Sequence, residues 1–139
     1  MHFEGSSNST LHHIWSYNFI VGILSDMAGS NNSFSDIQSY NNGYGIMMIG
    51  SNNVLNNIHT YNNSNEGVTL SNSSANNAFN NIQSHNNAVG IKLDLGGSNN
   101  TFSNVQSHNN TYGFYIIDTP DSILYTTQSY NNTTGMYLT

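Results

Sequence analysis

The sequence lacks cysteine and arginine, and it has a single lysine, Lys92, beside seven acidic residues, which gives a formal net charge of -6. Without cysteine, neither a disulfide framework nor a thiolate metal site can form. Nucleic acids and anionic membrane surfaces bind through cationic side chains, so the sequence argues against both as partners. The longest apolar stretch, around Phe19 to Leu24, is interrupted by Gly22 and is too short to cross a bilayer, so we expect no membrane insertion. Residues Met1 to Gly5 show no basic segment followed by an apolar one, and we expect no signal peptide here.

Charged residues make up only 6% of the chain, whereas asparagine occurs 27 times, so amides and hydroxyls supply most of the polarity. The same pattern of residues returns every 22 or 23 positions, and its glycines are Gly22, Gly45, Gly67, Gly90, Gly113 and Gly135. A repeat of this size cannot bury its apolar face alone, so the period predicts a stacked solenoid. We expect one domain over residues 1–139, with repeats at about 6–29, 30–50, 51–73, 74–97, 98–121 and 122–139.

Alternating side chains within each repeat indicate β-strands. One inward column reads Ile14, Ile37, Ile58, Ile82, Val105 and Thr127, and the next reads Ser16, Ser39, Thr60, Ser84, Ser107 and Ser129. A strand after each glycine and a shorter one that contains Leu11, Phe34, Leu55, Phe79, Phe102 and Leu124 complete the repeat. The sequence therefore predicts an all-β parallel β-helix of about six coils of 21–24 residues, with three short strands in each coil. Right-handed winding is the general expectation for parallel crossover connections.

The same alternation predicts an inward ladder of asparagines, because Ile37, Ser39 and Asn41 fall on one face of a strand. The predicted ladder is Asn18, Asn41, Asn62, Asn86, Asn109 and Asn131. Stacked amides at a bend satisfy backbone groups that leave the sheet, and asparagine tolerates the left-handed conformation that bends require. Asn18 is followed by Phe19 where the other coils have a second asparagine, which indicates a different bend in the end coil.

The motif Asn-Asn-x-Phe-x-x-Ile-x-Ser-x-Asn-Asn-x-x-Gly-Ile resembles the right-handed parallel β-helix repeats of the pectate-lyase-like superfamily. Segments 30–48 and 98–116 are similar to repeats of that group's carbohydrate-binding and sugar-hydrolase module, and of the periplasmic protein that assists copper-site maturation of nitrous oxide reductase. The resemblance covers almost the whole chain and implies the fold, because the repeated residues are those that build coils.

We expect no catalytic site and no cofactor. Glycosidases need two facing carboxyl groups, and the resemblance implies clustered acids with arginine or lysine for the superfamily's lyases and hydrolases. Here the acids are dispersed, and the nearest pair, Asp94 and Asp118, is offset by one residue along neighbouring coils.

One outward column is aromatic in every coil: Tyr17, Tyr40, Tyr61, His85, His108 and Tyr130. Stacked rings stabilise a sheet face without any ligand, and this structural interpretation is favoured. The column is also the candidate face for binding sugars. With His59 lying diagonally from His85, the imidazoles of His59, His85 and His108 are a weaker candidate for Cu(II) or Zn(II). His12 and His13 are expected to point to opposite sides of their strand.

Asn-x-Ser/Thr triplets are numerous, and Asn8, Asn31, Asn72 and Asn99 lie in expected turns, where they could carry glycans in a surface protein. Triplets at Asn62, Asn109 and Asn131 belong to the predicted inward ladder and are expected to be inaccessible.

The leading functional hypothesis is a structural β-solenoid at the cell surface or outside the cell, the periplasm included. It would stack end to end on copies of itself into a filament, or form a segment of a longer solenoid, because no polar cap is evident and uncovered end coils expose strand edges. The alternative is a carbohydrate-binding module that uses the Tyr/His column, with a polysaccharide as partner.

Overall fold

The computed structural model describes residues 1–26, 29–72, 74–94 and 97–139. Seven strands of these residues form one sheet: β1 (His2–Glu4), β3 (Val21–Asp26), β5 (Tyr44–Met48), β7 (Glu66–Leu70), β9 (Val89–Leu93), β11 (Tyr112–Ile116) and β13 (Thr134–Leu138). Six longer strands form the other: β2 (Thr10–Tyr17), β4 (Ser33–Tyr40), β6 (Val54–Tyr61), β8 (Ala78–His85), β10 (Thr101–His108) and β12 (Ile123–Tyr130). Among the described residues there is no helix long and apolar enough to cross a membrane.

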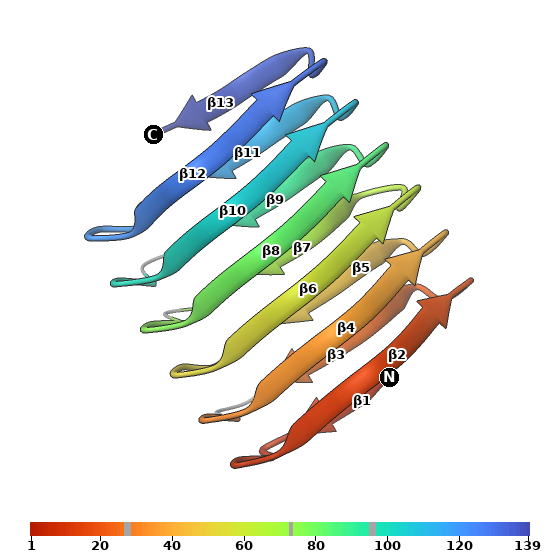
Figure 1. Cartoon of the computed structure of the whole chain (residues 1–139), viewed down its shortest axis with the longest axis vertical. Coiled ribbons are helices and arrows are strands. Elements are labelled where there is room, and N and C mark those ends of the chain that lie inside the picture. Colours follow the sequence, from red (N-terminus) through yellow and green to blue (C-terminus); the bar gives the residue numbers. More distant parts are fainter. Residues whose placement is uncertain (27–28, 73, 95–96) are drawn as a thin grey trace.

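The strands alternate between the two sheets, and every pairing is parallel to the strand one coil away (Figure 1). This arrangement is the parallel β-solenoid of about six coils that the sequence predicts. Each of the six expected repeats contains one eight-residue strand and one shorter strand. The expected boundary at residue 73 lies outside the described residues.

Each coil has two strands rather than the three that we predicted, because two of the expected short strands run on as a single eight-residue strand. A left-handed residue bends this strand at its fourth position, where Asp36 has φ 55° and Asn81 has φ 56°. Pairing skips this position and resumes on both sides, as in Ser35 with Asn56 and Ile37 with Ile58. The two predicted segments therefore persist as the two arms of one bent strand.

The core lies between the two sheets and is built from columns of apolar side chains. Its innermost members include Ile37, Ile58 and Ile82 from the long strands and Ile46 and Ile91 from the short strands, all at most 1% exposed. Because every coil adds one residue to each column, like side chains stack on like across coils. Burial of these columns is the main force that holds the coils together.

The asparagine ladder exists, but its members are the residues that follow those we predicted. The predicted column is exposed and left-handed, with φ values of 54–61°: Asn18, Asn41, Asn62, Asn86, Asn109 and Asn131. The inward ladder consists of Asn42, Asn63, Asn87, Asn110 and Asn132. A left-handed residue interrupts the alternation of the strand, so Asn41 turns out to solvent and Asn42 turns in.

Each ladder asparagine satisfies the backbone of the coil before it. The Asn63 side chain accepts a hydrogen bond from the backbone N–H of Asn42 (3.0 Å) and donates one to the carbonyl of Ser39 (3.1 Å). It also donates to Oδ1 of Asn87 in the next coil (3.0 Å). A second ladder, Asn32, Asn53, Asn77 and Asn100, does the same at the other corner of the coil. Buried backbone groups at both bends are thereby paired.

The repeated glycine is required by the packing of this corner. Ser107 donates a hydrogen bond from its side chain to the carbonyl of Gly113 (2.7 Å), and its hydroxyl oxygen occupies the space where a Cβ on Gly90 would lie. The backbone carbonyl of Gly113 would also be within 2.8 Å of that Cβ. The 22–23-residue glycine period thus marks a place where the adjacent coil leaves no room for a Cβ atom.

Candidate functional site

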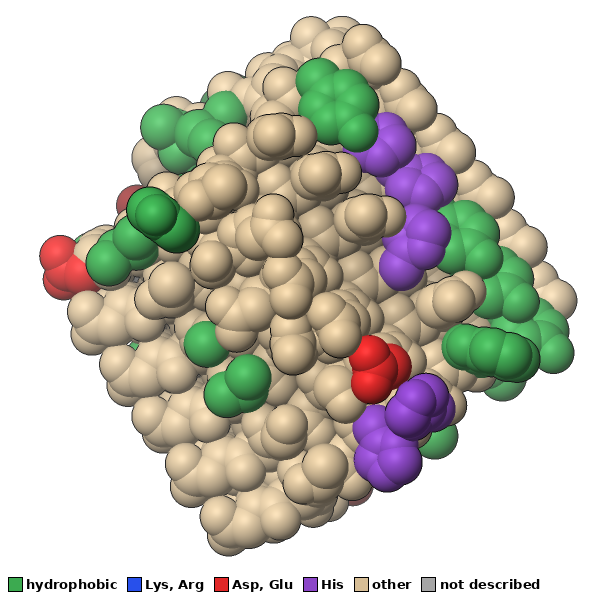
Figure 2. All heavy atoms as spheres, in the orientation of Figure 1, with side chains coloured by type: hydrophobic (Ala, Val, Ile, Leu, Met, Phe, Trp, Pro, Cys, Tyr) green, Lys and Arg blue, Asp and Glu red, His purple; other side chains and the backbone are tan. Residues whose placement is uncertain are grey.

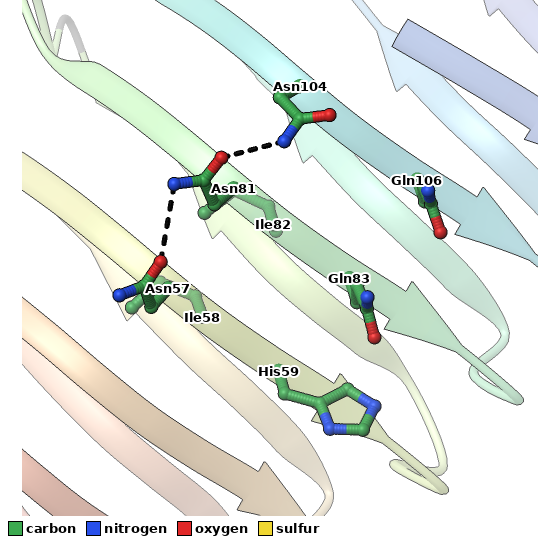
Figure 3. A pocket seen from close by; sticks show the side chains of 8 residues that line it. All are labelled: Asn57, Ile58, His59, Asn81, Ile82, Gln83, Asn104 and Gln106. Atoms are coloured by element: carbon green, nitrogen blue, oxygen red, sulfur yellow. Dashed lines mark hydrogen bonds between the residues drawn. The ribbon is translucent and has the colours of Figure 1, made fainter.

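A groove runs along the solenoid on the outer face of the six-stranded sheet. It begins at the bend of each long strand, where the left-handed residue and the residue two positions on both point outward. One wall is the asparagine row, Asn57, Asn81 and Asn104, and the other is the glutamine row, His59, Gln83 and Gln106 (Figure 3). The floor between the walls contains Ile58 and Ile82. A second hollow continues the groove toward the first coil, where it is lined by His13, Trp15, Asp36 and Gln38.

The asparagine row is held in place by hydrogen bonds between coils. Asn104 donates to Asn81 (2.7 Å), Asn81 donates to Asn57 (3.2 Å), and Asn57 donates to the carboxylate of Asp36 (3.0 Å). Asn81 also donates to Oδ1 of Asn56 (3.1 Å), whereas Asn57 and Asn104 each use one N–H in the row and keep the other for solvent or a ligand. The row is a prearranged line of polar groups whose direction is the same in every coil.

The glutamines of the second row have no such partners among the described residues. Trp15, Gln38, His59, Gln83, Gln106 and Gln128 occupy equivalent positions on adjacent strands. The side-chain amides of Gln83 and Gln106 make no hydrogen bond to any described residue, and both point outward beside the groove (Figure 3). Sequence reasoning missed this row, although a glutamine two residues after the bend was visible in four of the six coils.

The predicted aromatic column forms a continuous stack along the edge of this face, from Tyr17 to Tyr130. Successive ring centroids lie 4.7–5.4 Å apart and successive planes differ by 6–14°. Stacked rings cover one another's faces, so a sugar cannot lie on them and only their edges meet solvent. Trp15, which is 72% exposed at the end of the groove, stacks on no aromatic ring of the described residues and leaves its own ring face open.

The histidines form two close pairs on this face, seen as two groups of purple side chains in Figure 2. Nε2 of His59 lies 2.8 Å from Nε2 of His85, whereas His108 stacks on His85 with centroids 4.8 Å apart. Burial lowers the pKa of His59 and of His85, and nearby imidazoles lower both further, so these two rings are neutral at pH 7. The described residues contain no group of three or more His, Cys, Asp or Glu side chains arranged to hold a metal ion. The three-histidine site considered from the sequence is therefore not assembled.

The prediction that His12 and His13 point apart is wrong. Their Nδ1 atoms lie 2.7 Å from each other, and both side chains are exposed. His13 has φ 55° because it occupies the bend position of β2, and this left-handed residue breaks the alternation that the prediction assumed. Nε2 of His13 lies 4.0 Å from the carboxylate of Asp36 in the next coil.

Lys92 lies on the outer face of the seven-stranded sheet, away from the groove. Its ammonium group is 3.2 Å from Asp94 and 3.6 Å from Glu66, so the fold brings together two acids that the sequence left dispersed. Burial lowers the pKa of Lys92, but the hydrogen bonds and charges of the two carboxylates outweigh this effect and raise it. A lysine held in its charged form between two carboxylates stabilises the sheet and is a poor base.

Seven asparagines that begin glycosylation triplets are exposed. Asn8, Asn31, Asn72 and Asn99 are exposed turn residues, as expected. Asn62, Asn109 and Asn131, which we expected to be inaccessible, are exposed too, since they are the left-handed residues that precede the ladder.

A family model described as a right-handed β-helix region matches residues 2–139. No curated protein matches the chain in a sequence comparison.

Proposed function

The chain belongs to the right-handed β-helix family, and from the groove that its coils build we propose that it binds a neutral polysaccharide in an extended conformation. The observation that carries this proposal is the row of free glutamine amides that faces a row of fixed asparagines across an open groove. Amides donate and accept hydrogen bonds at once, as the hydroxyl groups of a sugar also do.

The spacing of the coils suits a polymer with a regular repeat. Adjacent strands of a sheet lie about 4.8 Å apart, which is close to the length of one pyranose unit in an extended chain. The third, fourth and fifth coils then each offer one asparagine and one glutamine or histidine to a sugar, whereas the second coil offers Asp36 and Gln38 and the first offers His13 and Trp15. From Trp15 in the first coil to Gln106 in the fifth, four such steps give a groove of about 19 Å.

Charge favours a neutral polymer over an acidic one. Asp36 is the only carboxylate that lines the two hollows, neither hollow is lined by lysine or arginine, and the formal net charge of the chain is -6. This field repels uronic acids and sulfated sugars. Trp15, with its ring face open at one end, provides the apolar platform on which a pyranose ring can lie.

The experiment is isothermal titration with neutral oligosaccharides of increasing length, chosen by a first screen against neutral and acidic polysaccharides. We expect affinity to grow up to about four sugar units and then to level off, since the groove spans about four coil steps. The double variant Gln83→Ala/Gln106→Ala and the variant Trp15→Ala should each bind at least tenfold more weakly. Tyr125→Ala is the matched control, because Tyr125 is an aromatic residue of this face with 67% exposure that lines neither hollow. Preference for acidic polymers, or equal binding by all variants, would refute the proposal.

End-to-end stacking is a second candidate function, and a specific observation favours it. In the last coil Met136 is 43% exposed and Leu138 is 64% exposed. Phe114 and Leu93, which lie in the same inward columns, are only 1% exposed. A further coil, from the same chain or from another copy, would cover these residues and pair with the free edges of β12 and β13. Both candidate functions go with a protein that is located at the cell surface or outside the cell.

Sedimentation velocity at rising protein concentration tests the stacking function. We expect the mass to increase with concentration, and the variant Met136→Lys/Leu138→Lys to remain a single species. A chain that stays monomeric at the highest concentration would contradict stacking and leave polysaccharide binding unaffected.

A further inference from the structure

His59 and His85 approach each other across two adjacent strands of the six-stranded sheet. His59 pairs in register with Gln83, and His85 pairs in register with Tyr61, so the two imidazoles meet on a diagonal. Their Nε2 atoms are 2.8 Å apart, with ring centroids 4.9 Å apart and planes inclined by 46°. Two imidazole nitrogens at this distance need one proton between them, which one ring donates and the other accepts.

The same distance suits two ligands of one metal ion. Imidazole nitrogens bind transition metals at about 2.0–2.1 Å, so two of them at right angles around an ion are about 2.9 Å apart, and two in a tetrahedron about 3.4 Å apart. The observed 2.8 Å is close to the first value. Square-planar and tetragonal coordination by nitrogen is typical of Cu(II) and Ni(II).

We propose that His59 and His85 form a two-histidine site for a divalent transition metal ion that prefers tetragonal coordination, Cu(II) or Ni(II). The ion takes the place of the shared proton, and the ring that donated this proton carries it on Nδ1 instead, so the number of bound protons stays the same. The remaining coordination positions are open to water or to a ligand in the groove, because His59 also lines the groove wall.

His108 is not a ligand in this proposal. Its ring lies parallel to that of His85, with planes inclined by 11°, and it therefore stacks on the ring rather than pointing at the space between the two Nε2 atoms. Stacking holds His85 in place, since His85 lies between Tyr61 and His108 in the aromatic column.

The test uses protein without a polyhistidine tag, in which the other three histidines are replaced. His12→Asn and His13→Asn introduce the residue type that stands at the equivalent positions of β6, and His2→Gln removes a ligand close to the N-terminus. Calorimetric titration of this background protein with Cu(II) and separately with Ni(II) should give one ion per chain. The electron paramagnetic resonance spectrum of the Cu(II) form should show a tetragonal centre with two nitrogen ligands.

Each variant replaces a histidine with the residue that a neighbouring coil has in the same column, so that the packing between coils is kept. His59→Gln gives the glutamine of the next coil, and His85→Tyr gives the tyrosine of the preceding one. Each should lower the affinity for Cu(II) at least tenfold, whereas the control His108→Tyr should leave it within threefold. Absence of binding by the background protein, or unchanged affinity in His59→Gln and His85→Tyr, would overturn the proposal. Equal loss in His108→Tyr would overturn the two-ligand assignment, and tighter binding of Zn(II) than of Cu(II) would overturn the tetragonal one.

Discussion

Replacement of one inward asparagine should destabilise the protein far more than replacement of its exposed neighbour. In Asn63→Ala the side chain loses three hydrogen bonds, and the backbone N–H of Asn42 and the carbonyl of Ser39 lose their partner inside the protein. A buried polar group without a partner costs about 1–3 kcal/mol, so the two backbone groups together give a loss of about 4 kcal/mol. This is a large part of the 5–15 kcal/mol, roughly, that stabilises a typical domain.

The control is Asn62→Gly, one residue earlier in the chain. Asn62 is exposed, has φ 54° and accepts a single side-chain hydrogen bond, from Asn86 (3.2 Å). Glycine adopts positive φ readily, so we expect a change below about 1 kcal/mol. Urea unfolding followed by far-ultraviolet circular dichroism measures both variants, and for a slope of about 2 kcal/mol per molar the midpoint of Asn63→Ala should fall by about 2 M. Similar losses in both variants, or a larger loss in Asn62→Gly, would show that the inward ladder is assigned to the wrong residues.

Three further predictions concern other parts of the coil. Gly90→Ala should prevent correct stacking of the coils and yield insoluble or strongly destabilised protein. Gly135→Ala should fold normally, because the nearest atom to its added Cβ is 3.6 Å away. Expression level and thermal melting compare the two variants. Without metal, the melting temperature should be highest above pH 6.5 and should fall as the pH drops below that value. The reason is that folding lowers the pKa of His59 and of His85, so protonation of these rings favours the unfolded state. His59→Gln should reduce this fall, and an unchanged pH profile in that variant would contradict the reasoning. Lys92→Met should cost about 1–2 kcal/mol in urea unfolding, because it leaves two half-buried carboxylates near each other without a cation, and a more stable variant would show that the cluster does not contribute.

Much of the fold was predictable from the sequence because burial is periodic. The glycine period, the isoleucine column through Ile37 and Ile58, and the serine column through Ser39 all lie where the alternation predicts. These positions belong to extended strand segments, in which side chains alternate strictly between the two faces. The prediction of stacked aromatic rings from Tyr17 to Tyr130 is confirmed for the same reason.

The wrong ladder residues, the wrong number of strands in each coil and the wrong orientation of His12 and His13 all result from left-handed residues. Strict alternation, continued past Asn41 or His13, assigns the following side chains to the wrong face of the strand. The positive φ of these residues rotates the backbone, so the two-residue alternation of side chains is broken there. One signal for the correct ladder was present in the first coil. Phe19 stands there in place of the inward asparagine, and its backbone N–H donates to Asn42 (2.9 Å). The bend of the first coil is therefore served by Asn42 and not by Asn41.

The groove could not be predicted from the sequence because it arises from the bend within each long strand. Asn57 and His59 were visible as polar residues two positions apart, but alternation alone makes them neighbours on a flat face rather than opposite walls of a hollow. Which histidine nitrogens meet also depends on ring rotation and on the diagonal offset between strands. Side-chain geometry of this kind is not encoded in a residue column.

Because the asparagine ladder runs in one direction, every coil is an equivalent structural unit. A coil brings the amide that its predecessor needs and leaves at its own bend the same backbone groups for the amide of its successor. A gene segment that encodes one whole coil can therefore be duplicated or lost at any point in the interior without leaving a bend unpaired, whereas a change of half a coil breaks the ladder. Solenoids of this kind can lengthen by tandem duplication, and the glutamine and histidine positions of each new copy are then free to diverge.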